Sequence, residues 1–149
     1  MQLQHWHTLA RQRGLSSTAS GNVFVVEDFF LPQLRRKRRL WVYLPPDYFT
    51  TTQCYSVLYM HDGQNLFDAA TAFAGEWGVD KTLDRLFYER AFPGLIVVGI
   101  ENGGSKRVEE YIPQQRGLSH AAFLTDTLKP AIDRSLRTLP HRESTGIAG

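Results

Sequence analysis

Short runs of β-branched and aromatic residues alternate with polar segments along this chain. Residues 23–30 and 40–44 are two such runs, and the polar interval between them predicts a hairpin of two strands. Residues 45–47 contain two prolines and end the second strand, because proline has no backbone N–H for a strand ladder. A third run, Tyr55 to Met60, predicts a strand that leads into the polar, glycine-bearing turn His61 to Asn65.

The second half of the chain shows helical periodicity. Apolar residues at i, i+4, i+7 and i+8 predict a helix from Val79 to Arg90, and the apolar run Leu95 to Ile100 predicts the buried strand of a βαβ unit. Apolar residues recur every four positions between Ser119 and Arg137, which predicts a second helix with Ser119 as its N-cap. An interior proline costs roughly 3 kcal/mol, so we expect a kink or a break just before Pro130.

The two ends of the chain complete the predicted organisation. Residues 1–20 show no clear periodicity and are expected to form an extended leader, which Trp6 could pin to the rest. Residues 21–149 are expected to form a single α/β domain, and Thr145 to Ala148 predicts its last strand. The predicted fold is a mostly parallel sheet with an antiparallel N-terminal hairpin and helices on both faces. A chain of 149 residues is long enough for one such core.

Composition excludes several classes of function. The net charge of +2 does not favour nucleic acid or an anionic membrane, and no apolar stretch is long enough for a signal peptide or a membrane span. We therefore expect a cytoplasmic protein with a small-molecule partner, and homo-oligomerisation stays open. Cys54 is the only cysteine and is expected to be buried. The basic run Arg35 to Arg39 is expected to be a solvated turn.

The turn His61 to Asn65 is the first candidate for chemistry. Ligands of open α/β sheets bind outside the carboxyl ends of the strands, where this turn would emerge with free backbone N–H groups. The alternative is a plain strand-to-helix connection whose Asp and Asn side chains bond to their own backbone. The pair His5 and His7 has no clear third ligand nearby, so no metal site and no cofactor are expected.

Four segments of the chain together resemble a known family. They follow in order as His61-Asp62-Gly63-Gln64-Asn65-Leu66-Phe67, Gly99-Ile100-Glu101-Asn102-Gly103-Gly104, Arg107-x-x-Glu110-Tyr111-x-Pro113 and Leu124-x-x-Thr127-Leu128-Lys129-Pro130-x-Ile132-Asp133. In this order they resemble the "putative esterase" family of α/β-hydrolases, which includes esterase D-like enzymes and siderophore (enterochelin) esterases. The resemblance implies the N-terminal half of an α/β-hydrolase fold, in a serine hydrolase that cleaves carboxylic esters through an acyl-enzyme.

The resemblance also assigns roles to residues of this chain. The turn after the third strand supplies an oxyanion donor in this fold, so the backbone N–H of Gln64 is the expected donor and Gly63 allows close approach. His61, Asp62 and Asn65 are expected to brace this turn or to shape the substrate pocket. The remaining candidates for substrate contact are Arg107, Glu110 and Tyr111, although an Arg107–Glu110 ion pair that locks the loop is the favoured role for the first two.

The resemblance also implies where the catalytic serine would lie. In the family, the segment that resembles Thr145 to Gly149 leads into a Gly-x-Ser-x-Gly elbow, and the acid and the histidine follow the serine. All three would lie beyond Gly149, so the chain alone is expected to be inactive. Ser144 precedes the predicted strand and is a poor nucleophile, and His120 and His141 are expected to be surface histidines.

Two other functional classes stay open. The chain could be a non-catalytic remnant or binding module that keeps the same partial fold. A nucleotide-binding domain of the Rossmann or flavodoxin type is suggested by the βαβ order and by Gly103-Gly104. However, the first strand-helix turn lacks the Gly-x-Gly-x-x-Gly pattern, and the sequence contains no Gly-Lys-Ser/Thr motif to hold phosphate.

Overall fold

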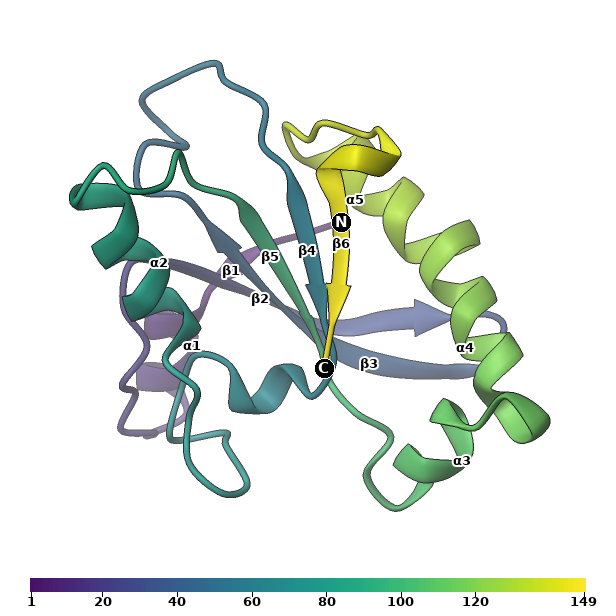
Figure 1. Ribbon diagram of the computed structural model, residues 1–149. Coiled ribbons are helices and arrows are strands. Elements are labelled where there is room, and N and C mark those ends of the chain that lie inside the picture. The colour runs from purple at the N-terminus through teal and green to yellow at the C-terminus, as the bar shows by residue number, and fades with distance from the viewer.

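The computed structural model describes residues 1–114 and 116–149 and contains one six-stranded sheet with helices on both faces (Figure 1). The strand order across the sheet is β1-β2-β3-β5-β4-β6. The strands are β1 (Gln4–His5), β2 (Asn22–Leu31), β3 (Arg36–Leu44), β4 (Val57–Met60), β5 (Ile96–Ile100) and β6 (Thr145–Ala148).

The sheet is mixed. β2 and β3 form the predicted antiparallel hairpin, and β3 also lies antiparallel to β5. β4 lies parallel to both β5 and β6, so β5, β4 and β6 make up the parallel part of the sheet. β4, the helix after it and β5 form the predicted βαβ unit. The carboxyl ends of the three parallel strands therefore meet at one edge, which is where ligands bind in sheets of this kind.

Helices cover the sheet on two sides. Figure 1 shows α1 and α2 on one side and the long helical segment that contains α4 and α5 on the other. The helices are α1 (Trp6–Gln12), α2 (Val79–Tyr88), α3 (Arg107–Tyr111), α4 (Leu118–Ala122) and α5 (Lys129–Ser135), with π-helical segments η3 (Pro113–Gly117) and η4 (Phe123–Leu128) and 3₁₀ turns η1 (Gly63–Asn65), η2 (Gly104–Lys106) and η5 (Arg142–Ser144).

The core has two parts, one on each face of the sheet. Leu40, Val42 and Leu44 alternate along β3 with Trp41 and Tyr43, so the two sets point to opposite faces. The first set belongs to the cluster completed by Phe123, Leu128 and Ile132, and the second to the cluster that includes Trp6 and Phe67. Burial of both strand faces explains why the strands read as nearly continuous apolar runs.

The N-terminal segment is folded, which corrects the expectation of an extended leader. Residues 4–5 pair with β2, and residues 6–12 form α1, whose Trp6 and Ala10 are fully buried. Trp6 Nε1 donates to the buried carboxylate of Asp68, as the hydroxyl of Ser17 does. The local sequence has weak periodicity because these few anchoring contacts, rather than a continuous apolar face, hold the segment on the sheet.

The second helix also differs from the prediction. The chain stays helical from Leu118 to Ser135, and Leu128 and Lys129 keep right-handed helical dihedral angles, so the alternative of a break before Pro130 is wrong and the kink stays a prediction. The π-helical segment η4 directly precedes the helical turn that contains Pro130, and π-helical segments are places where helices kink. Ser119 lies inside α4 and caps nothing.

Two further expectations from local sequence are wrong. The basic run lies mostly within β3 and not in the turn, and its Arg36, Arg38 and Arg39 side chains bind the carboxylates of Glu27 and Glu110. Cys54 is exposed, because the inward-facing residues of this stretch begin only at Tyr55.

Removal of the Trp6 side chain tests whether the N-terminal segment belongs to the core. Trp6→Ala should lower the free energy of unfolding by about 3–5 kcal/mol, because it empties a fully buried site and strips a donor from Asp68. Trp77→Ala is the control, since Trp77 is 51% exposed and its loss should change stability by only about 0.5 kcal/mol. Urea denaturation measures both free energies of unfolding. If Trp6→Ala lowers this free energy no more than Trp77→Ala does, the Trp6 side chain does not contribute to the core.

Candidate active site

The candidate site lies at the carboxyl ends of the parallel strands. β4 leads into His61, β5 leads into Glu101, and β6 leads into Gly149, which is marked C in Figure 1 where the strand arrows converge. The backbone N–H of His61 donates to the carbonyl of Ala148 over 2.9 Å, so the turn after β4 and the end of β6 are in direct contact.

The turn after β4 packs directly on the backbone of β5. A Cβ atom at Gly63 would lie 2.6 Å from the Gly99 carbonyl carbon and from the Ile100 nitrogen. A Cβ at Gly99 would in turn lie 2.8 Å from Leu66 Cδ1. The close approach expected at Gly63 is therefore an approach of two backbones, which fixes the height of the turn above the sheet.

Asp62 connects this turn to the loop after β5. Its φ of 54° lies in the left-handed region, and only 7% of the residue is exposed. Arg107 binds its carboxylate in a bidentate manner, with Nε to Oδ1 at 2.8 Å and Nη2 to Oδ2 at 2.7 Å, and Asn102 Nδ2 donates to Oδ1 over 2.7 Å. Hydrogen bonds from Arg107, and then from Asn102, hold the pKa of Asp62 below its usual value.

Glu110 forms a separate buried ion cluster. It is 1% exposed, and its carboxylate binds Arg38 Nη2 at 2.8 and 2.9 Å and also Arg36. The expected Arg107–Glu110 pair is therefore wrong: each residue pairs with a partner from another element. Arg107 instead lies over the ring of Tyr111, 5.1 Å from its centroid. These contacts fix the short helix α3 against both β3 and the turn after β4.

His61, His120 and Tyr111 form an aromatic cluster beside the turn. The Nε2 atoms of the two histidines are 3.1 Å apart, and the Tyr111 ring packs edge-on against both imidazoles. His120 is only 7% exposed, so its assignment as a surface histidine is wrong. Burial lowers the pKa of His120 to about 4 and raises that of Tyr111 to about 12, which keeps both side chains uncharged near neutral pH.

A sequence signal for His120 existed. His120 falls four residues before Leu124 and so continues the apolar repeat through Leu128 and Ile132 that predicted the helix. A residue in that register faces the sheet. Asn102 was also missed as a partner of Asp62, although it lies inside one of the four family segments.

The other residues of the turn hold the long connection to α2. Asn65 Oδ1 accepts a hydrogen bond from the Phe73 backbone N–H at 3.0 Å, and the Asn65 carbonyl accepts one from that of Trp77 at 2.7 Å. The Gln64 carbonyl accepts from the Thr71 hydroxyl over 2.7 Å. Among residues 1–114 and 116–149, the backbone N–H of Gln64 has no hydrogen-bond acceptor.

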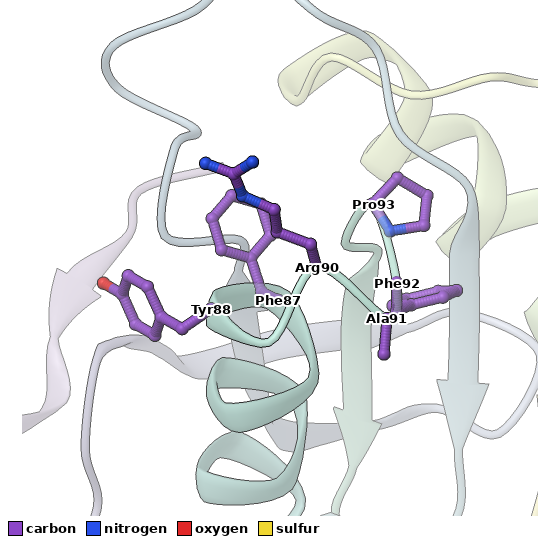
Figure 2. A pocket seen from close by; sticks show the side chains of 6 residues that line it. All are labelled: Phe87, Tyr88, Arg90, Ala91, Phe92 and Pro93. Atoms are coloured by element: carbon purple, nitrogen blue, oxygen red, sulfur yellow. The ribbon is translucent and has the colours of Figure 1, made fainter.

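Two cavities adjoin this edge. One of about 680 Å³ is open, and its lining includes Gln64, Phe73, Asn102 and Arg107. One of about 200 Å³ lies over the aromatic cluster of His61, Tyr111 and His120. Figure 2 shows a third cavity, formed by the end of α2 and the segment that leads into β5. That cavity lies at the opposite end of the strands and contacts none of the candidate residues.

The described residues contain neither a metal-binding cluster nor a membrane-spanning helix. Within the part of the chain that the structure describes, no three or more His, Cys, Asp or Glu side chains gather in a way that could hold a metal ion. Among the same residues, no helix has the length and apolar character needed to cross a bilayer.

Comparison with known proteins identifies the family. Residues 32–149 match the model of the family described as "Putative esterase", so this chain belongs to that family. The predicted family and the predicted type of fold, an open sheet with helices on both faces, are thereby confirmed.

Particular relatives are similar to this chain in sequence or in fold. The uncharacterised protein YbbA of Bacillus subtilis is 25% identical over 125 residues, which cover 75% of this chain and 46% of YbbA. The IroE-like serine hydrolase of Shewanella oneidensis has a TM-score of 0.62 and 22% identity, covering 76% of this chain and 39% of that one. The enterobactin esterase FES of Shigella flexneri has a TM-score of 0.64 and 16% identity, covering 85% and 29%. The chain thus spans less than half the length of each of these proteins.

The Asp62–Arg107 pair predicts a pH-dependent contribution to stability. Asp62→Asn should cost about 1–2 kcal/mol at pH 7, because the amide cannot accept both hydrogen bonds from a partly exposed guanidinium, while Asn tolerates the left-handed conformation. The pKa of Asp62 is lowered in the folded state, so its contribution is complete above the ordinary value of 3.8 and disappears as the pH falls below that value.

The difference between wild type and Asp62→Asn should therefore narrow as urea denaturation is repeated from pH 7 down to pH 3. Asp28→Asn is the control, since the Asp28 side chain is 73% exposed and lies 3.9 Å from Lys37. A difference for Asp62→Asn that stays constant with pH would contradict the ion-pair account.

The Gly63 contact gives a second prediction. Gly63→Ala should lower the free energy of unfolding by about 1–3 kcal/mol, because the new methyl group meets rigid backbone of β5. Gly146→Ala should cost less, since its Cβ would meet only the mobile end of the Leu58 side chain, at 3.1 Å. Thermal denaturation ranks the two variants, and the reverse order would be inconsistent with a backbone contact at Gly63.

Proposed function

We propose that this chain forms the oxyanion side of a serine hydrolase that cleaves carboxylic esters through an acyl-enzyme. The backbone N–H of Gln64 is the proposed oxyanion donor. In the family pattern, the nucleophile, the acid and the base follow Gly149, so residues 1–149 alone do not carry out the reaction. The proposed partner is a small-molecule ester.

One observation carries this proposal. The 2.9 Å hydrogen bond from the His61 backbone to the Ala148 carbonyl joins the turn that contains Gln64 to the end of β6. In the family pattern, a serine two residues after Gly149 leaves the sheet at this point. The two groups that must act on the same carbonyl, a nucleophile and an N–H donor, would then approach it from adjacent strands.

The proposed chemistry follows from this arrangement. The base expected after Gly149 takes the proton of the serine hydroxyl and later passes it to the leaving alcohol. The serine oxygen attacks the ester carbonyl carbon, and negative charge develops on the carbonyl oxygen. A fixed N–H donor at that oxygen is worth about 2.7–4 kcal/mol of transition-state stabilisation. The alcohol then leaves, and water hydrolyses the acyl-serine. Asp62, held by Arg107 and Asn102, keeps the donor turn rigid and takes no part in proton transfer.

The proposed place for the substrate is the open cavity of about 680 Å³. It lies directly beside the turn, and Gln64, Asn102 and Arg107 give it a polar floor. Phe73 is 93% exposed at its rim and offers an apolar surface to an acyl or alcohol group. Arg107 can contact a substrate here while it holds Asp62, because 45% of its side chain is exposed.

A fluorophosphonate probe tests the proposal, since it labels an activated serine irreversibly. The product of the coding sequence read beyond Gly149 should be labelled at the serine two residues after Gly149 and should hydrolyse p-nitrophenyl esters. The 149-residue chain should be neither labelled nor active. Intact mass and peptide mapping locate the label.

Two outcomes would overturn this account. Labelling of Ser144 in the 149-residue chain would place the nucleophile elsewhere. A continuation that lacks Ser-x-Gly after Gly149 would remove the esterase proposal and favour the non-catalytic binding module.

A further inference from the structure

His61 and His120 make a contact that the proposed ester chemistry does not use. His61 follows β4 and His120 lies in α4, 59 residues later, yet their Nε2 atoms are 3.1 Å apart. The other ring nitrogen of His61, Nδ1, lies 3.2 Å from the carbonyl oxygen of Ala148. A single imidazole thus connects a buried helix residue to the end of β6.

These two contacts define the positions of the ring protons. A carbonyl oxygen only accepts hydrogen bonds, so Nδ1 of His61 carries a proton. In the uncharged ring, Nε2 of His61 then holds a lone pair and must accept from Nε2–H of His120. Nδ1 of His120 consequently has no proton. It is a buried atom without a hydrogen-bond partner among the described residues, as is the hydroxyl of Tyr111.

The surroundings keep this arrangement in place. Tyr111 packs edge-on against both rings, with centroids 5.0 Å from His61 and 5.2 Å from His120, and the ring of Phe123 also packs against His120. A Cβ atom at Gly149 would lie 2.6 Å from Cβ of His61, so the residue after β6 lies directly against this histidine. The Ala148 carbonyl accepts from both the backbone N–H and the ring of His61.

We infer that His120 is a positioning residue that acts through His61 to hold the end of β6. It fixes the tautomer of His61, and His61 in turn holds the Ala148 carbonyl with a second hydrogen bond. This role rests on the proposed function, because the end of β6 is where the nucleophile turn would begin. A histidine holds its partner in one orientation when its other ring nitrogen makes a further hydrogen bond, as metal-ligating histidines do.

The inference predicts a spectroscopic signature that general packing would not produce. In protein labelled with ¹⁵N-histidine, long-range ¹H–¹⁵N spectra at pH 7 should show His61 protonated at Nδ1 and His120 protonated at Nε2. His120→Phe keeps an aromatic ring but removes the donor, so His61 should become a mixture of tautomers. The backbone N–H of His61 should then exchange with solvent roughly fivefold faster, the loss expected for one hydrogen bond.

A conservative variant and a control complete the test. His120→Gln can return an N–H near the position of Nε2 and should restore both the His61 tautomer and the exchange protection. His141→Phe, at an exposed position, should change neither. If His120→Phe does not fold, the wild-type tautomers and His120→Gln still decide the matter.

The inference is overturned if wild-type His61 carries its proton on Nε2. It is also overturned if His120→Phe leaves both the tautomer and the exchange rate of His61 unchanged. Neither readout needs ester hydrolysis, so its failure is distinct from a failure of the fluorophosphonate test.

Discussion

The candidate site depends on one close contact between two backbones. Gly63 lies directly on Gly99 and Ile100, where any Cβ atom would be 2.6 Å from β5. This contact sets the height of the turn after β4 and therefore the position of each group that the turn carries. The Asp62 carboxylate reaches the loop after β5, and the backbone N–H of His61 donates to the carbonyl of Ala148 at the end of β6. Packing in protein interiors leaves little room for adjustment, so glycine is required at both ends of this contact.

Buried charge holds the remainder of the edge in place. The carboxylates of Asp62 and Glu110 are almost fully buried, and each is bound by at least one arginine with short hydrogen bonds. Removing such groups from water is costly, and only well-formed pairs offset the cost. Each pair joins elements that are distant in sequence, so α3 and its flanking loops have one arrangement against the sheet. The contact between His61 and His120 extends this ordering to β6.

The sequence predicted the elements better than their contacts. Strands β2 to β6 and helix α2 were found from apolar runs and periodicity, because burial on a sheet face leaves a local pattern. The prediction of an extended leader was wrong because Trp6 and Ala10 anchor this segment, and two buried residues are too few to make a periodic pattern. The alternative of a break at Pro130 was wrong, since the chain stays helical through the π-helical segment η4 and into α5. Arg36 and Arg38 were read as a solvated run, since their buried partner Glu110 lies more than seventy residues away.

The sequence by itself determined the family, strands β2 to β6 and helix α2. These follow from local patterning and from short motifs that lie within a few residues. Only the tertiary structure decided that Arg107 binds Asp62 and not Glu110, that Gly63 packs on the backbone of β5, and that His120 contacts His61. Each of these contacts joins residues from different elements. Their geometry depends on how the layers pack, which no local pattern encodes.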